Sequence, residues 1–307
     1  IGMSVSLSRL RRVSCVVEDI ELAVRYLESL FRAQRLENVP TQIHPGSGRH
    51  LAHIGLGDLV IELVAPQVKD DAWGERLDQY GPHVASLAYG IEEMDQLLAD
   101  LSDDNLEFTH TESGAIWCRS RALIGFDLIL EPGEQGPLAE LPGAWGEVSP
   151  MLHVEITHHD IAQAGRWLER LFGSKRVEQE FSEFLVGITA GRMDIQHFSL
   201  GDAVLQYIEP RHDAGPWWEL LQKAGPSVHN ITWLVNDMPA VATASQAAGT
   251  RGLRYFEFDY APLFGEENRI GDKTVGRIID CAHILGFHLE LSERQAKNIN
   301  TYMYKEV

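Results

Sequence analysis

Histidine and glutamate alternate with apolar residues in two stretches of the second half of the chain. His153 and Glu155 do so in the run LHVEIT, and His288 and Glu290 in the run FHLEL. Since neighbouring residues of a β-strand point to opposite faces, each run would gather its imidazole and carboxylate on one polar face. Imidazole suits zinc, iron or nickel, and a carboxylate supplies hard anionic oxygen. Burying an unpaired carboxylate is costly, so Glu290 on an inward face indicates a functional site.

An internal duplication relates these positions to the first half. The segment 225–238, GPSVHNITWLVNDM, aligns without a gap with 81–94, GPHVASLAYGIEEM, 144 residues earlier (225 − 81). The segment 197–210, HFSLGDAVLQYIEP, matches 53–66, HIGLGDLVIELVAP, at the same offset. A helical block repeats at an offset of 141 (164 − 23) and a Gly-Phe pair at 161 (286 − 125). A repeat that keeps its register through several blocks predicts a chain built twice over.

Strand–helix–strand units would position the polar residues. Asp19 and Asp160 are N-caps in front of stretches with helical periodicity. Gly57-Asp58 and Gly201-Asp202 mark hairpin turns between strands. Residues 131–150, rich in proline and glycine, are expected to link the halves. Further elements are expected near 92–101 (helix), 115–118 and 124–130 (strands), 228–235 (strand), 237–248 (helix) and 287–291 (strand).

Composition limits the partners. The chain has 307 residues, 44% hydrophobic, with a net charge of −19. This charge argues against binding a nucleic acid backbone or an anionic membrane surface. The three cysteines are few and far apart, which favours free thiols in a reducing compartment. Without an apolar run of membrane-spanning length or a signal peptide, we expect a cytoplasmic protein.

The motifs LGDLVIELVAP, LGDAVLQYIEP, HNITWLVND and LGFHLEL resemble the vicinal oxygen chelate superfamily. That superfamily includes glyoxalase I, methylmalonyl-CoA epimerase, bleomycin-resistance proteins and extradiol dioxygenases. The resemblance covers residues 10–292 and implies an α+β fold with two tandem glyoxalase-like halves. Each half would be a pair of βαβββ modules forming a half-open β-cup. The expected divisions are an N-terminal half at 1–134, a linker at 135–149, a C-terminal half at 150–292 and a tail at 293–307.

The resemblance implies that the C-terminal cup holds the active site. Its metal ligands would be His153, Gln206 and Glu290, with His229 as a substitute ligand if a β-bulge turns it inward. Glu290 and Gln206 would also be the catalytic residues, near the proton being moved. The implied cofactor is a weakly held or readily lost divalent metal (Fe, Zn, Ni, Co or Mn). The expected pocket residues are Asn230, Glu155, His288, Trp217 and Tyr260.

Asn230, rather than His229, is the residue that strand parity turns into the cup. Asn230 precedes Asp237 by seven residues, as His153 precedes Asp160. Many members of the family carry His-His where this chain has His-Asn, and a neutral amide is a poor ligand for such metals. The alternative is that His153 is a buried pocket histidine without a metal.

The N-terminal cup is expected to be a degenerate site that binds no metal. The repeat places Arg12, Glu62, Ser86 and Ile129 at its matching positions. Arginine and isoleucine cannot ligate a metal, so Arg12 with Glu62 indicates a buried ion pair or a carboxylate-binding arginine.

Three functions for a small-molecule substrate remain open. The first is a metal-assisted lyase, isomerase or epimerase, and the second is an extradiol-type ring-cleaving dioxygenase. The third is a metal-free protein that binds or sequesters a small aromatic or carboxylate ligand. An aromatic-rich insertion at 251–270 is expected to cover the second cup or to pack on a neighbouring subunit. The polar tail could dock on a second copy, which would make a homodimer.

Overall fold

A computed structural model of the chain provides the structure, which describes most of its residues. Several predicted features lie outside the described residues. They are Tyr260, the linker at 135–147, most of the expected helix at 237–248, and most of the insertion and the tail. The described residues are 5–37, 39, 49–67, 72–103, 106–111, 114–133, 148–178, 193–211, 215–235, 239–240, 243, 254–258, 276–293 and 305–306.

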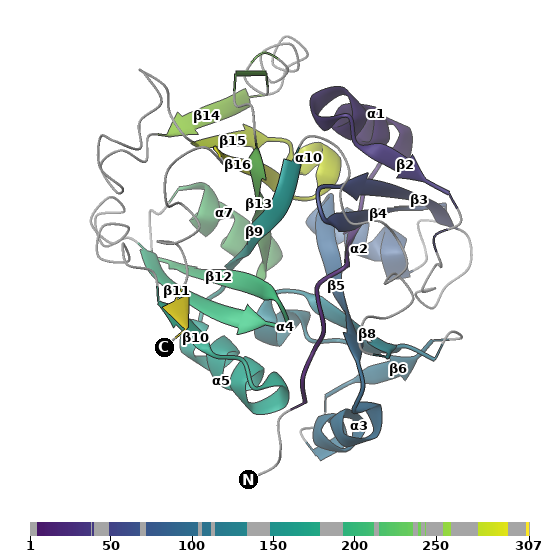
Figure 1. Cartoon of the computed structure of the whole chain (residues 1–307), viewed down its shortest axis with the longest axis vertical. Coiled ribbons are helices and arrows are strands. Elements are labelled where there is room, and N and C mark those ends of the chain that lie inside the picture. Colours follow the sequence, from purple (N-terminus) through teal and green to yellow (C-terminus); the bar gives the residue numbers. More distant parts are fainter. Residues whose placement is uncertain are drawn as a thin grey trace.

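Two sheets, one from each half, form the framework (Figure 1). The N-terminal elements are β1 (Arg12–Val16), α1 (Ile20–Phe31), β2 (Gln34–Leu36), β3 (Arg49–Leu56), β4 (Leu59–Pro66), α2 (Ala72–Tyr80), β5 (His83–Ile91), α3 (Met94–Asp103), β6 (Phe108–His110), β7 (Ile116–Cys118), α4 (Arg121–Ile124) and β8 (Asp127–Pro132). The C-terminal elements are β9 (Val148–Thr157), α5 (Ile161–Phe172), β10 (Arg176–Glu178), β11 (Met193–Leu200), β12 (Ala203–Pro210), α7 (Pro216–Ala224), β13 (Ser227–Val235), β14 (Arg254–Phe258), β15 (Gly276–Asp280), α10 (Ala282–Leu285), β16 (His288–Glu293) and β17 (Lys305–Glu306).

Each sheet joins two modules through their first strands. The N-terminal order is β2-β3-β4-β1-β5-β8-β7-β6, in which β1 and β5 pair antiparallel. The C-terminal order is β14-β15-β16-β13-β9-β12-β11-β10-β17, with β9 and β13 joined in the same way. Asp19 and Asp160 cap α1 and α5 with their side chains, as predicted. The predicted α+β fold of two paired-module halves is confirmed.

The strand registers of the two halves are equivalent, which supports the duplication at the level of hydrogen bonding. Arg12 lies opposite Val60 in one sheet, and His153 lies opposite Val204 in the other. Both members of the second pair follow the first by the repeat offsets of 141 and 144. The predicted equivalence of Arg12 and His153 therefore holds in the register.

The predicted strand at 124–130 was placed too early. Ile124 ends the short helix α4, and Gly125 follows with a positive φ of 91°, so the strand begins only at Asp127. An added Cβ on Gly125 would lie 2.3 Å from a side-chain carbon of Ile156 in the other half. The glycine is needed both for its backbone conformation and for this close approach. The same strand continues to Pro132, so Glu131 belongs to the sheet and not to the linker.

The halves exchange hydrogen bonds through the aspartates of their hairpin turns. Asp202 accepts from the backbone N–H of Leu10 at 2.8 Å, and Asp58 accepts from the N–H of Met151 at 2.8 Å. These bonds are equivalent under the repeat, so they fix the halves symmetrically. Arg9 lies between both carboxylates, 3.2 Å from Asp58 and 3.5 Å from Asp202.

Removing either aspartate is expected to lower the free energy of unfolding by about 1–3 kcal/mol, because a backbone donor at the junction loses its acceptor. Urea unfolding of Asp58→Ala and Asp202→Ala measures this. Asp194→Ala is the control, since Asp194 pairs with Arg211 on the exposed surface and such pairs contribute little. Equal stability of all three variants and the wild type would contradict a role of the two aspartates in joining the halves.

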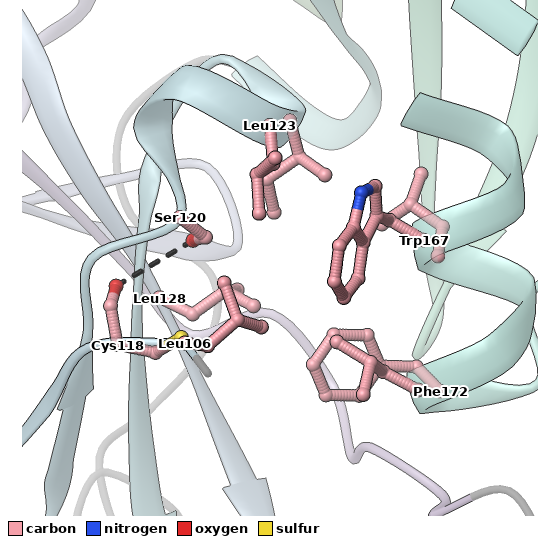
Figure 2. A pocket seen from close by; sticks show the side chains of 10 residues that line it. Leu106, Cys118, Ser120, Leu123, Leu128, Trp167 and Phe172 are labelled. Atoms are coloured by element: carbon pink, nitrogen blue, oxygen red, sulfur yellow. Dashed lines mark hydrogen bonds between the residues drawn. The ribbon is translucent and has the colours of Figure 1, made fainter. Parts of the chain in front are cut away.

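A small apolar junction lies where α5 packs against the N-terminal half (Figure 2). Trp167 and Phe172 of α5 face Leu106, Leu123 and Leu128 there. The junction also contains Cys118, whose pKa burial raises to about 12, so the thiol is not activated. The apolar contacts around this cavity hold the two halves together, and its lining residues offer little chemistry.

Among the described residues, no helix has the length and apolar character needed to cross a membrane.

Candidate functional site

A β-bulge in β13 turns two neighbouring side chains into the C-terminal cup. Against β9, Val228 pairs with Ile156 and Asn230 with Glu155, so His229 is the extra residue. A bulge interrupts the alternation of strand faces. His229 and Asn230 consequently both contact polar side chains of the cup. The β-bulge that an inward-pointing His229 requires is therefore present in β13.

Glu290 on β16 is the centre of a buried hydrogen-bonded row. Its Oε2 accepts from Asn230 Nδ2 and, at 3.1 Å, from Thr232 Oγ1. Thr232 Oγ1 lies 2.9 Å from His153 Nε2, which is 3.9 Å from Glu290 Oε2. Because the hydroxyl donates its single hydrogen to Glu290, His153 Nε2 is the donor toward Thr232. All four side chains are buried.

His229 is fixed by a second network beside this row. Its Nδ1 lies 3.0 Å from Glu155 Oε1 and 2.9 Å from Asn230 Oδ1. Trp217 on α7 donates from Nε1 to the same Glu155 oxygen at 2.7 Å, and its ring stacks on His229 with centroids 5.1 Å apart. Both neighbours of Nδ1 are acceptors, so Nδ1 carries a proton. Burial opposes the charged form, but Glu155, Asn230 and Glu290 together raise the pKa of His229.

Gln206 and His288 lie at the edges of these networks. Gln206 on β12 donates from Nε2 to His197 Nε2 at 2.9 Å, since burial lowers the pKa of His197 well below its usual value and keeps that ring neutral. His288 Nδ1 is 3.3 Å from Asp280 Oδ1, and its ring is centred 4.8 Å from that of His229. Burial and the neighbouring His229 lower the pKa of His288 to about 4.

The structure thus places most of the sequence-predicted residues in two clusters from β9, β13, β16 and α7, with Gln206 of β12 and His288 of β16 at their edges. One cluster joins His153, Asn230 and Glu290, and the other joins Glu155, His229 and Trp217. Sequence reasoning missed Thr232, which links His153 to Glu290. Its strand parity, two residues after Asn230, was the available signal. It also missed Asp280, because nothing in the sequence places β15 beside β16.

The N-terminal cup has a different polar centre. Arg12 is fully buried, with Nη2 2.9 Å from Glu131 and Nε 4.0 Å from Glu62. The predicted pairing with Glu62 is therefore the longer of two contacts, and Glu131 is the nearer partner. Glu62 also accepts from Ser14 at 2.7 Å and contacts His53 at 3.1 Å. The His53–Glu62 contact is the repeat equivalent of the bond between Gln206 and His197.

Aromatic side chains fill the other end of the N-terminal cup. Trp73 of α2 stacks on Trp117, with centroids 5.8 Å apart, and Arg76 lies over both rings. Asp127 accepts from Arg76 at 2.9 Å and from Trp117 Nε1 at 3.1 Å. The bulge recurs in this half and places Ala85, the repeat equivalent of His229, in the same apolar cluster. The N-terminal cup is packed with side chains of its own.

The C-terminal donor set fits a divalent metal poorly. Two ligands about 2.1 Å from one ion at a tetrahedral angle would lie about 3.4 Å apart, whereas His153 and Glu290 are 3.9 Å apart with Thr232 bonded to both. Asn230 turns its N–H group, not its oxygen, toward Glu290. Among the described residues, no group of three or more His, Cys, Asp or Glu side chains is placed to hold an ion.

Buried neutral histidines predict that stability falls in acid. Burial lowers the pKa of His83 to about 3 and of His153, His158 and His288 to about 4. Below a pH of about 6.5 these histidines bind protons in the unfolded chain but remain neutral in the folded chain. The free energy of unfolding should drop by on the order of several kcal/mol between pH 6.5 and 4. Urea unfolding across this range measures the drop, and a flat profile would contradict it. The raised pKa values of Glu131 and Asp202 act in the opposite direction.

Comparison with protein families identifies the C-terminal half directly. Residues 152–256 match the model of the Glyoxalase/Bleomycin resistance protein/Dioxygenase superfamily. This segment of the C-terminal half is therefore similar to the superfamily that the motifs resemble. The match begins one residue before His153 and includes Gln206, His229 and Asn230. A comparison with curated proteins found no matching sequence.

Solved structures agree with the superfamily assignment at the level of the fold. A mutant of 4-hydroxymandelate synthase from Streptomyces coelicolor superposes with a TM-score of 0.65 at 17% identity, covering 94% of this chain and 93% of that one. A xylose isomerase-like TIM barrel/4-hydroxyphenylpyruvate dioxygenase fusion protein gives 0.57 at 12% identity. That alignment covers 97% of this chain but only 52% of the fusion protein. At these identities the likeness shows the fold alone.

Proposed function

We propose that the C-terminal cup binds a small organic molecule with a carbonyl group and moves a proton on it, as an isomerase, epimerase or lyase. The observation that carries this proposal is the row from His153 through Thr232 to Glu290. A buried carboxylate connected by a hydroxyl to a neutral imidazole is suited to general acid–base chemistry.

Glu290 is the proton acceptor in this proposal. The carbon next to the substrate carbonyl loses a proton to the Glu290 carboxylate, and the electron pair of the C–H bond passes to the carbonyl oxygen. Returning the proton to the other face, or to a neighbouring carbon, completes an epimerisation or an isomerisation. Asn230 and Thr232 hold the carboxylate in position. Burial lowers the pKa of His153 to about 4, so its ring is neutral at pH 7 and can exchange protons through Thr232.

The N-terminal cup does not offer the same chemistry. The repeat equivalent of Glu290 is Ile129, which lies in the apolar cluster with Trp73 and Trp117. Its acidic residues are engaged with Arg12 at 2.9 and 4.0 Å. We therefore assign the function to the C-terminal half and a structural role to the N-terminal cup.

Proton exchange with deuterated water tests the proposal without knowledge of the natural substrate. Acetophenone, phenylacetone, pyruvate and 2-oxobutyrate each carry exchangeable hydrogens beside a carbonyl. Proton NMR should show these signals disappearing faster with the protein than with heat-inactivated protein for at least one probe. Exchange at the background rate for all four would contradict the proposal, and binding without exchange would favour a sequestering protein.

The second candidate is a dioxygenase. It is favoured by the fold likeness across nearly the whole chain to 4-hydroxymandelate synthase, together with an imidazole and a carboxylate in the cup. Oxygen uptake with catechols in the presence of added ferrous iron distinguishes it from the first. Uptake that depends on both iron and Glu290 would favour the dioxygenase.

A further inference from the structure

Three buried nitrogen atoms near the junction of the two halves have no hydrogen-bond partner among the described residues. They are Nη1 of Arg76, Nη2 of Arg121 and Nε2 of His83. Arg121 is only 9% exposed and His83 only 5%. Buried polar groups of folded proteins are nearly always satisfied, and those left open commonly mark a place for water, an ion or a ligand.

A chain of contacts places these side chains in one cluster. The Arg121 guanidinium lies 4.4 Å from the centre of the Tyr80 ring, and that ring meets His83 edge to face with centroids 5.4 Å apart. Asp127 joins the two arginines, because it accepts from Arg76 Nη2 at 2.9 Å and from the backbone N–H of Arg121 at 3.1 Å. The cluster therefore lies where α2 ends and where β5 and α4 begin.

The C-terminal half borders this cluster and adds a further cation. Lys223 of α7 lies beside Gly81, with Nζ 3.8 Å from the position that a Cβ on this glycine would take. The backbone of His83 packs on Gly286, where an added Cβ would lie 2.6 Å from it. Lys223 is exposed, and 21% of the Arg76 side chain is exposed. Solvent therefore reaches the cluster past two long and flexible side chains.

Positive charge exceeds negative charge in this cluster. Arg76, Arg121 and Lys223 carry three positive charges and Asp127 carries one negative charge, an excess of two (3 − 1). The Asp127 carboxylate also accepts from the indole of Trp117 at 3.1 Å, so it is already engaged. Leaving guanidinium nitrogens buried without an acceptor is costly. The partner that would satisfy them is an anion, because oxyanions form strong charge-assisted hydrogen bonds with arginine.

The internal repeat indicates that the fold does not require this cluster. Four of its residues, Arg76, Tyr80, His83 and Arg121, have small or apolar equivalents in the C-terminal half, namely Leu220, Ala224, Ser227 and Ala282. That half forms the equivalent elements α7, β13 and α10 without the polar side chains. A costly buried group that the fold can form without indicates binding rather than packing.

The hydrogen-bonding direction at His83 selects the kind of anion. Nδ1 lies 2.8 Å from the carbonyl oxygen of Gly81, which is an acceptor, so Nδ1 carries the proton and Nε2 of the neutral ring is an acceptor. A fitting ligand therefore accepts from two guanidinium groups and donates from a hydroxyl group. Hydrogen phosphate does both, whereas sulfate at neutral pH carries no hydroxyl group.

We propose that Arg76, Arg121 and His83 bind a hydrogen phosphate ion at the junction of the halves, outside the C-terminal cup. The two guanidinium groups donate to phosphate oxygens, and the phosphate hydroxyl donates to His83 Nε2. Lys223 adds positive charge on the side of the other half. This site is separate from Glu290 and its network, so it does not rest on the function proposed above.

Calorimetric titration with matched salts tests the proposal at a pH of about 8, where an ordinary histidine is also neutral. At constant ionic strength, wild type should bind phosphate about tenfold or more tightly than sulfate, because a sulfate oxygen would face the lone pair of His83 Nε2. Arg121→Leu should weaken phosphate binding by about tenfold or more, and His83→Phe should bind the two ions within about twofold of each other. Arg119→Leu is the matched control and should bind as wild type, since it removes the same charge from an exposed arginine that pairs with Glu107.

Two further measurements guard against a misfolded variant. Arg76→Met alters a partly exposed side chain and should also weaken phosphate binding by about tenfold. Nitrogen-15 NMR of wild type labelled at histidine should show the His83 Nε2 resonance shifting with phosphate and not with sulfate. The proposal is overturned if wild type binds no phosphate, binds sulfate equally or more tightly, or keeps this resonance unmoved. Full phosphate binding by folded Arg121→Leu or Arg76→Met, or an equal loss in Arg119→Leu, would also overturn it.

Discussion

Asn230→His is expected to raise the affinity of the C-terminal cup for divalent transition metals by on the order of 100-fold or more. Wild type offers one imidazole and one carboxylate, His153 and Glu290, whereas catalytic metal sites usually supply three protein ligands. Asn230 lies beside Glu290, and its amide donates to that carboxylate. An imidazole there would add the missing strong ligand. Calorimetry with Zn, Ni, Co, Mn and Fe(II) on both proteins measures the gain.

Ser86→His is the matched control for this substitution. Ser86 is the repeat equivalent of Asn230, but the equivalents of His153 and Glu290 in this half are the fully buried Arg12 and the apolar Ile129. A fixed positive charge and a side chain without a lone pair should leave metal affinity unchanged there. If neither wild type nor a folded Asn230→His binds any of the five metals, the cup has no metal-binding geometry. This result would favour the interpretation of the chain as a metal-free protein that binds a small molecule.

Glu290→Gln is expected to reduce proton exchange on carbonyl probes by about 10²- to 10⁴-fold, because the amide cannot accept the proton. The substitution preserves size and leaves a hydrogen-bonding oxygen for Thr232. Thr232→Val should have a smaller effect, since it removes the connection to His153 and not the base. Proton NMR in deuterated water gives each rate.

Glu62→Gln is the control for this second prediction. Glu62 is a buried carboxylate at the centre of the N-terminal cup, bonded to Ser14 and His53. Its substitution should leave the exchange rate within about twofold of wild type when corrected for folded protein. Loss of exchange in Glu62→Gln but not in Glu290→Gln would move the functional site to the other half.

The internal repeat allowed the fold to be predicted from the sequence. Equivalent blocks at fixed offsets predicted the paired modules, and strand parity placed His153 and Glu290 on the inner face. Strand parity did not predict the bulge at His229, because one extra residue in β13 breaks the alternation that parity assumes. Its equivalent is Ala85, whose small side chain gave no sign of a repeated bulge.

The remaining errors come from contacts between elements distant in sequence. Glu131 was assigned to the linker because prolines and glycines follow it, but it continues β8 and contacts Arg12 at 2.9 Å. Asp280 reaches His288 through the pairing of two strands that the sequence does not align. In the sequence alone Thr232 is an ordinary strand residue, because its role depends on its contacts with His153 and Glu290. Local patterns predict elements and faces, whereas these contacts depend on tertiary packing.

Proton exchange in the presence of a chelator tests the central claim most directly. Wild-type protein treated with EDTA is mixed with acetophenone or phenylacetone in deuterated water, and the hydrogens beside the carbonyl are followed by proton NMR. A metal-independent acid–base site predicts exchange above background at the same rate with and without EDTA, and its loss in Glu290→Gln. Exchange that appears only when a divalent metal is restored, or that is unaffected by Glu290→Gln, would contradict the account.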